Sequence, residues 1–359
     1  MRKPAGSFGS YFHRKIAIHP PEEVAKRFLE CFDGSAIELF RRFIARHSEV
    51  RKWIIAADFS QHNDRPFDCF AFTIIPYDAW PAEIERDVKQ ALPKDLKKSK
   101  DLNDEAIEWL RDPRRFHVAI TVNDRPAVFW NGPGSVQLAI AREFIAITLA
   151  NAVQASMPEE TLARIKKLKQ DAQANGFNVG LLANIWLLAV WFPILTILIG
   201  RERRSEIISW FPDRDNMSNY CDHIWYDLAL WNAQLFAQTV SVDMTTTRCP
   251  AGAPDRSGVK EHMWFDYMIR AADWIAGTVA AWDRKRNLVP GDQRKYLRML
   301  ENVIPSADNI VVLHLDMNES GMQFRRIVAK RKNWFMRIIT DFMNAMRRIG
   351  HWIGTWFGK

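Results

Sequence analysis

The sequence predicts an α/β fold in which a mixed sheet is flanked by helices, with an inserted apolar helical region and a basic C-terminal helical extension. Short runs of β-branched and aromatic residues alternate with longer segments of helical periodicity, which is the order expected of an α/β protein. Of the 359 residues, 48% are hydrophobic and 26% charged, which excludes disordered and low-complexity classes. The four cysteines are scattered without a CxxC pair, which excludes a disulfide framework and a thiolate zinc site and favours a cytoplasmic setting.

The first part of the chain predicts helices at its start, followed by strands interspersed with further helices. Its helical segments begin with acidic residues or proline, and a capping box at Ser35-Ala36-Ile37-Glu38 divides the first helical region into two helices. Its strand segments are rich in aromatic and β-branched residues. The expected helices are 21–48 (as two helices), 81–92 and 103–112, and the expected strands are 52–58, 67–77 and 116–124.

The second part predicts mainly helices, at 137–153, 159–173, 217–239 and 261–285, with strands at 206–211 and, less regularly, at 239–247. No repeat is evident and no linker is long enough to force a domain boundary. We therefore expect an N-terminal helical segment at 1–49, a central domain at 50–288 with a helical insertion around 135–204, and a C-terminal extension at 289–359. No secretory signal is expected from the basic N-terminal residues, which are not followed by an apolar stretch.

Residues 181–200 form an apolar segment that is long enough to cross a bilayer. A membrane-spanning helix there would place Asp58 on one side of the membrane and Asp213 on the other. The sheet and the membrane span therefore exclude each other. We expect a buried helix, interrupted at Pro193 and packed against the sheet or a partner subunit.

The last 37 residues carry the whole net charge of +8, with nine basic side chains against Asp341 alone. Their apolar positions recur at helical spacing, so a basic amphipathic helix is expected. Three roles are open: contact with nucleic-acid phosphates through residues such as Arg331 and Lys332, contact with a membrane surface, or packing on the protein's own core. Homo-oligomerisation is a further open point.

Four aspartates attract attention because of their positions. Asp58 ends the first strand, Asp213 and Asp215 follow the fourth, and Asp273 lies in an otherwise apolar helix. Residues beyond strand ends line a shared crevice in an α/β sheet, and carboxylates gathered there favour a hard divalent cation such as Mg²⁺. The alternatives are a turn cap for Asp58, a helix N-cap for Asp213 or Asp215, and an arginine partner for Asp273.

Several motifs resemble those of the bacterial RNase H-like proteins of domain-of-unknown-function family 3800. Ala57-Asp58-Phe59-Ser60 stands where members have a strand ending in Asp-Glu-Ser, and Asp95-Leu96-Lys97-Lys98-Ser99-Lys100 is similar to their Glu-x-Lys segment. Residues 116–124 match a third strand, and Ala272-Asp273-Trp274-Ile275-Ala276-Gly277 matches a late Ala-Asp-x-x-Ala-Gly helix. The resemblance covers about residues 50–285, but Phe59 and Asp95 both replace glutamates.

The resemblance implies an RNase H-like mixed sheet and a divalent-metal-dependent nuclease or related phosphodiester-processing enzyme. It assigns catalysis to Asp58, Asp215 and Asp273, and binding of Mg²⁺ or Mn²⁺ to these three together with Asp213. Lys97 and Lys98 would contact the substrate, and nucleic acid is the expected partner. The alternative is a non-catalytic module that binds nucleic acid or protein, with peripheral membrane association as a variant. Walker, GxGxxG and HExxH motifs are all lacking.

Overall fold

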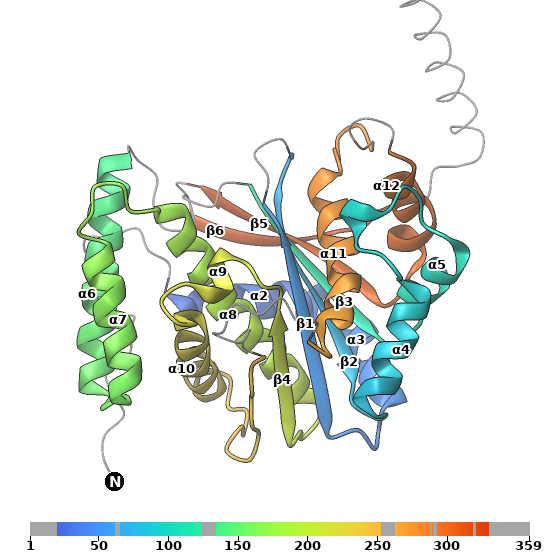
Figure 1. The fold of residues 1–359 in the computed structure, drawn as a ribbon. Coiled ribbons are helices and arrows are strands. Elements are labelled where there is room, and N and C mark those ends of the chain that lie inside the picture. The colour runs from blue at the N-terminus through green and yellow to red at the C-terminus, as the bar shows by residue number, and fades with distance from the viewer. Residues whose placement is uncertain are drawn as a thin grey trace, which may run out of the picture.

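The computed structural model describes residues 20–61, 65–123, 134–252, 263–287, 289, 293–318 and 321–329, which are built on one mixed sheet (Figure 1). Its strand order is β4-β1-β2-β3-β5-β6. β1, β2 and β3 are antiparallel neighbours, β4 is parallel to β1, β5 is parallel to β3, and β6 is antiparallel to β5. The strands are β1 (Lys52–Ser60), β2 (Asp68–Pro76), β3 (Phe116–Val122), β4 (Ile207–Pro212), β5 (Ile310–Asn318) and β6 (Gly321–Ile327).

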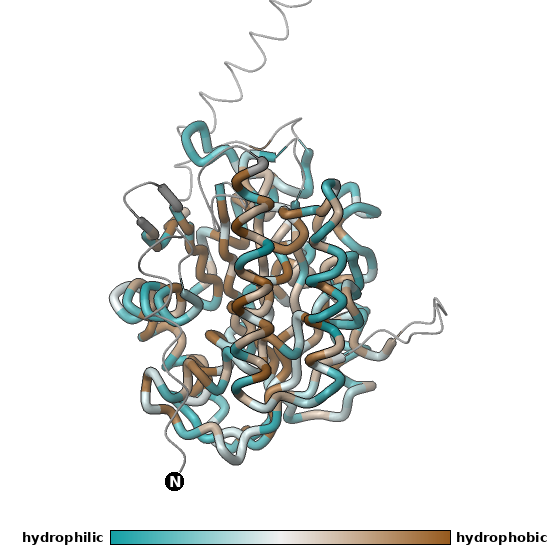
Figure 2. The backbone as a smooth tube through the Cα atoms, turned by 90° about the vertical axis from the view of Figure 1, so that its left-hand side faces the viewer, coloured by the Kyte–Doolittle hydropathy of each residue, from teal (hydrophilic) through white to brown (hydrophobic). Residues whose placement is uncertain are grey.

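Helices cover both faces of this sheet, so the predicted α/β class and mixed sheet are confirmed. The helices over one face are α2 (Pro21–Ser35), α3 (Ile37–Arg46), α8 (Val179–Glu202) and α10 (Ile224–Thr239). Those over the other are α4 (Pro81–Ala91), α5 (Asp104–Arg111), α11 (Asp266–Ala281) and α12 (Arg294–Arg298). The pair α6 (Gly134–Gln154) and α7 (Glu159–Asp171) lies at the side of α8 and α10 (Figures 1 and 2). The remaining short helices are η1 (Leu96–Lys98), α9 (Asn216–Asn219), η4 (Met299–Val303) and η5 (Ile304–Ser306).

The side chains of β1 alternate between the two cores. Trp53, Ile55 and Ala57 pack on the α8 side, whereas Ile54 and Ala56 pack on the α11 side. Because helices cover both faces, the strand reads as a continuous apolar run rather than as an alternation of apolar and polar residues. The same alternation of side chains places Asp58 on the α11 side of the sheet, two residues after Ala56.

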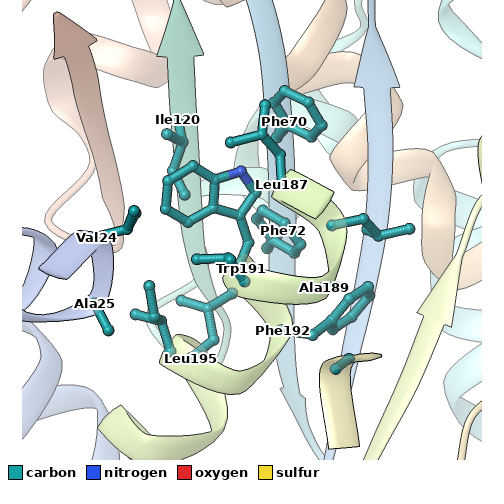
Figure 3. Close-up of a cluster of buried hydrophobic side chains, with 14 of the residues drawn as sticks. Val24, Ala25, Phe70, Phe72, Ile120, Leu187, Ala189, Trp191, Phe192 and Leu195 are labelled. Atoms are coloured by element: carbon teal, nitrogen blue, oxygen red, sulfur yellow. The ribbon is translucent and has the colours of Figure 1, made fainter. Parts of the chain in front are cut away.

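Helix α8 is the centre of the larger core. All residues from 182 to 199 are buried, and Trp191 lies against Phe70 and Phe72 of β2 and Ile120 of β3 (Figure 3). Within the described parts of the chain, two helices are long and apolar enough to cross a membrane, namely α8 and Val136–Gln154 of α6; the apolar windows of these helices are 100% and 28% buried. The surface of α8 is therefore taken up by the protein's own core.

The interruption of α8 expected at Pro193 is wrong, because the helix is continuous through that residue. Proline cannot donate the hydrogen bond that the carbonyl oxygen of Ala189, four residues earlier, would normally accept. Asn232 of α10 supplies a replacement, since its Nδ2 donates to the Ala189 oxygen at 2.9 Å. The contact between α8 and α10 thus satisfies the carbonyl that proline leaves free.

Three local predictions are wrong. Ser35 does not begin a capping box; its Oγ donates to the Cys31 carbonyl oxygen at 2.6 Å, and Ala36 takes the N-cap position of α3 without a side-chain cap. The strand expected at 239–247 is replaced by the end of α10 and a series of turns. The sheet is instead completed by β5 and β6, which lie in the segment assigned to a C-terminal extension.

Buried histidines predict acid sensitivity of the fold. His117 of β3 lies with Nδ1 3.0 Å from the Thr73 hydroxyl, and burial lowers its pKa to about 3. The unfolded chain takes up a proton below about pH 6.5 that folded His117 does not, so stability present above that pH is lost on acidification. We expect His117→Gln to reduce the slope of unfolding free energy against pH by up to about 1.4 kcal/mol per pH unit between pH 6.5 and pH 4.5. Urea unfolding across this range measures the slope, and equal slopes in both proteins would contradict the prediction.

Candidate functional site: an acidic cleft at the end of the sheet

A cleft of about 1030 Å³ opens where β1 and β4 end side by side. The two strands are parallel, and the backbone N–H of Asp213 donates to the Ala57 carbonyl oxygen at 2.8 Å, which places the residues after each strand next to each other. All four predicted carboxylates, those of Asp58, Asp213, Asp215 and Asp273, line this cleft. Its other walls come from η1, α11 and the first turns of α8.

Asp58 and Asp273 form the centre of the cleft. Their carboxyl groups lie within hydrogen-bonding reach of each other, although Asp58 lies near the end of β1 and Asp273 in the middle of α11. Burial raises the pKa of Asp58 well above its ordinary value, and the negative charges of Asp273 and Asp213 raise it further. Burial also raises the pKa of Asp273. Two acidic groups in contact favour either a shared proton or a bound cation.

Backbone donors hold both carboxylates in place. The N–H of Phe59 donates to Asp58 Oδ1 at 2.7 Å, and the N–H of Leu96 donates to Asp273 Oδ2 at 2.7 Å. The sequence indicated that Asp273 needs a partner in its apolar helix, with arginine as one alternative. Within the described residues no ion pair of Asp273 with a basic side chain is found, so its partners there are Asp58 and the η1 backbone.

Asp213 and Asp215 have different roles. Asp215 caps α9, since its Oδ1 accepts the backbone N–H groups of Met217 and Ser218, each at 2.8 Å, and Ser218 completes a capping box. Asp213 makes no such cap, and burial raises its pKa while the Arg214 backbone and Lys97 oppose the rise. The N-cap alternative therefore describes Asp215, and Asp213 is the more suitable third carboxylate of the cleft.

The basic side chains of the cleft fall into two groups. Lys98 and Arg270 pair with Asp95 at 2.9 and 3.3 Å, and Arg214 pairs with Asp266. By contrast, neither Lys97 nor Arg65 forms an ion pair in the part of the chain that the structure describes. Of the two predicted substrate-binding lysines, Lys97 is therefore the one without an ion pair among the described residues, although it lies in the field of Asp213 and Asp273.

Arg65 was not predicted from the sequence; its guanidinium donates to the Gly277 carbonyl oxygen and, at 3.1 Å, to the Tyr296 hydroxyl. No motif or spacing indicates this residue, because its partners lie more than two hundred positions further along the chain. The α8 wall was missed as well. There Asn178 caps the helix by accepting the N–H of Leu181 at 2.9 Å.

A second groove, of about 730 Å³, lies between α5 and the segment before β5 and differs in its electrostatics. Some of its carboxylates pair with arginines, as in the ion pairs of Asp112 with Arg114 and of Asp87 with Arg115, which stacks on Trp109. The acidic cleft instead brings two carboxylates against each other. The acidic cleft is therefore the better candidate site.

Carboxylate oxygens are the ligand type that a hard cation prefers, and the cleft offers enough of them for a cation bound by two protein ligands. Among the described residues, no three His, Cys, Asp or Glu side chains are grouped so as to hold a metal ion together. Mg²⁺, however, is often bound by one or two carboxylates, with water and substrate phosphate as its other ligands. The adjacent pair of Asp58 and Asp273 matches that pattern, with Asp213 in the same cleft.

Some predicted residues lie outside the described parts of the chain. These are Arg331 and Lys332 together with the rest of the expected basic C-terminal helix. Comparison of the chain with protein-family models, with curated proteins and with solved structures finds no match. The geometry of the cleft, together with the sequence motifs, is therefore the basis for assigning a function.

Proposed function

We propose that the chain is a divalent-cation-dependent nuclease or related phosphodiester-processing enzyme with an RNase H-like acidic site in this cleft. The observation that supports the proposal most strongly is the pair of Asp58 and Asp273, whose carboxyl groups lie within hydrogen-bonding reach of each other. A pair of partly buried carboxylates is costly for a fold to keep, and a cation is its natural counter-charge. Strained or costly electrostatics of this kind are concentrated at functional sites.

Asp58 and Asp273 would hold Mg²⁺ or Mn²⁺ as a pair of ligands, and the charge of Asp213 in the same cleft would add to the attraction. Such an ion, when bound, lowers the pKa of water and stabilises the charge that develops on phosphoryl oxygens. The backbone N–H groups of Phe59 and Leu96 fix the orientation of the two carboxylates in advance, so little reorganisation is needed during the reaction. Lys97 places a positive charge beside Asp213 and Asp273 for the substrate phosphate.

The alternative is a non-catalytic module that uses the same cleft to bind nucleic acid or a protein. Phe59 in the place of a glutamate favours this alternative, since it removes one oxygen ligand from the motif. A cytoplasmic location, with the basic C-terminal segment contacting nucleic acid or a membrane surface, and a homo-oligomeric state remain part of the proposal.

The test is cation-dependent cleavage by the full chain. Labelled single-stranded and double-stranded DNA and RNA are incubated with protein in Mg²⁺, in Mn²⁺ and in EDTA, and binding of Mn²⁺ is measured by calorimetry. We expect cleavage with either cation, none in EDTA, and heat of binding that disappears in Asp273→Asn. Cation binding without cleavage of any of these substrates would favour the binding module. Absence of both would overturn the proposal.

A further inference from the structure

We infer that the cleft binds a single strand of nucleic acid, with its phosphates on Arg65 and Lys97 and one base against Phe59. The inference rests on the proposed function and names its substrate class. It uses residues on both faces of the sheet, because the cleft passes over the end of β1 from the α11 side to the α8 side.

The two cations that form no ion pair within the described ranges, Lys97 and Arg65, both line the cleft that holds the carboxylates. Lys97 directly follows Leu96, whose N–H donates to Asp273 at 2.7 Å, and its side chain lines the same cleft. Arg65 contacts the carbonyl oxygen of Gly277, one turn of α11 beyond Asp273. Its two hydrogen bonds go to neutral groups and leave the charge and the remaining N–H donors available. A chain of phosphates that passes the acidic pair would therefore meet both cations in the same cleft.

The opposite wall suits a base rather than a phosphate. Phe59 is half-buried, and its ring packs at 5.5 Å from that of Phe70, which fixes its position while it lines the cleft. Aromatic rings on which bases stack are typical of proteins that bind single strands. The residue that departs from the family motif by losing an acid thus gains the means to hold a base.

Amide groups lie deeper on the same wall. Asn184 is an exception among the buried, mostly apolar residues of α8; it is 5% exposed and donates from Nδ2 to Gln61 Oε1 at 2.8 Å. Its Oδ1 is buried and has no hydrogen-bond partner within the described ranges. A buried carbonyl oxygen without a partner is costly, and an amino or hydroxyl group of a nucleotide that reaches it would satisfy it while Nδ2 keeps its bond to Gln61.

The size of the cleft favours a single strand over a duplex. About 1030 Å³ is close to the upper range of small-molecule pockets and accommodates a few nucleotides. Duplexes are instead recognised over extended surfaces that follow a groove. A strand whose bases are unstacked enters a cleft of this size and brings a phosphate to the carboxylates.

The test measures binding of fluorescent dT20 and U20 strands, and of a 20-base-pair duplex, to the full chain in EDTA, so that no cleavage is required. We expect Arg65→Gln to weaken binding of single strands about tenfold and to reduce the slope of log affinity against log salt by about 0.7 to 1. We expect Phe59→Leu, which keeps an apolar side chain against Phe70, to weaken binding about 5- to 10-fold at an unchanged slope. Lys26→Gln on the exposed face of α2 is the matched control and should change neither quantity.

The outcomes separate this inference from the proposed function. Binding of strands with the expected effects, but without cleavage in Mg²⁺ or Mn²⁺, supports the inference and contradicts the nuclease. Cleavage combined with unchanged single-strand affinity in both variants overturns the inference alone. An equal loss of duplex affinity in Arg65→Gln would also overturn it. Circular dichroism and thermal melting of Phe59→Leu confirm that the variant is folded.

Discussion

Replacing Asp58 with asparagine is expected to reduce cation-dependent cleavage by about 10³-fold, which corresponds to ~4 kcal/mol of lost transition-state stabilisation. Asparagine has the same shape and keeps an oxygen for the N–H of Phe59 at the position where Asp58 Oδ1 now accepts it. It removes the negative charge on which cation binding depends. The measurement is kcat/KM on a labelled strand in Mg²⁺, together with Mn²⁺ calorimetry.

The same substitution is expected to stabilise the cation-free fold. The pKa of Asp58 is raised in the folded state, so ionisation disfavours the folded state as pH rises through the folded pKa. A neutral amide removes this cost and the repulsion from Asp273 and Asp213. In EDTA at pH 7, we expect a higher melting temperature for Asp58→Asn than for the wild type.

The control is Asp308→Asn, because that carboxylate is 89% exposed and lines the second groove instead. It should alter neither cleavage nor melting. If Asp58→Asn cleaves as fast as the wild type, Asp58 does not belong to the catalytic site. A melting temperature of Asp58→Asn below that of the wild type would show that the charge of Asp58 stabilises the fold.

Substitution of Trp191 by alanine is expected to lower the free energy of unfolding by about 3 to 5 kcal/mol. The ring is fully buried in the core of α8, where it also meets Phe28 of α2 and Phe324 of β6 at 6.1 and 5.9 Å between ring centroids. Its loss would leave a cavity between a helix, the sheet and an edge strand. Urea unfolding monitored by far-ultraviolet circular dichroism measures the change.

Two further variants make this prediction specific. Trp191→Phe keeps most of the packing and removes an indole N–H that has no partner in the described structure, so it should cost less than about 1.5 kcal/mol. Trp80→Ala, at a position that is 75% exposed, should cost less than about 1 kcal/mol. Similar costs for Trp191→Ala and Trp80→Ala would mean that α8 is not buried in a soluble core, and would revive the membrane-spanning alternative.

The parts of the fold that could be predicted are those in which local pattern and tertiary role agree. The strands β1 to β4 have apolar runs because both faces are covered, and this pattern is visible in the sequence. β6 lacks it, because an edge strand carries charges such as Arg325 and Arg326. The 239–247 segment has strand-like composition, yet only Arg248 and Ala251, just beyond it, bridge to β4.

In the candidate site, too, some residues could be predicted from a local sequence pattern and others only from the folded structure. Asp213 was predictable because it follows β4, and Asp58 because it is the first acidic residue after the apolar run of β1. Asp273 was predictable because a carboxylate in an apolar helix needs a partner. The choice of Asp213 over Asp215 depends on a cap within α9 that only the geometry shows. The position of Arg65 depends on contacts with Gly277 and Tyr296, distant in the chain, for which no local pattern exists.

The pairing of β3 with β5 has a consequence for biosynthesis. Nearly two hundred residues separate the two strands along the chain, so the edge of β3 has no neighbour on that side until the ribosome has released residues 310–318. An unpaired central strand is a template for aggregation during this interval. The nascent chain is therefore expected to depend on a holding chaperone late in translation, when the apolar α8 has already emerged.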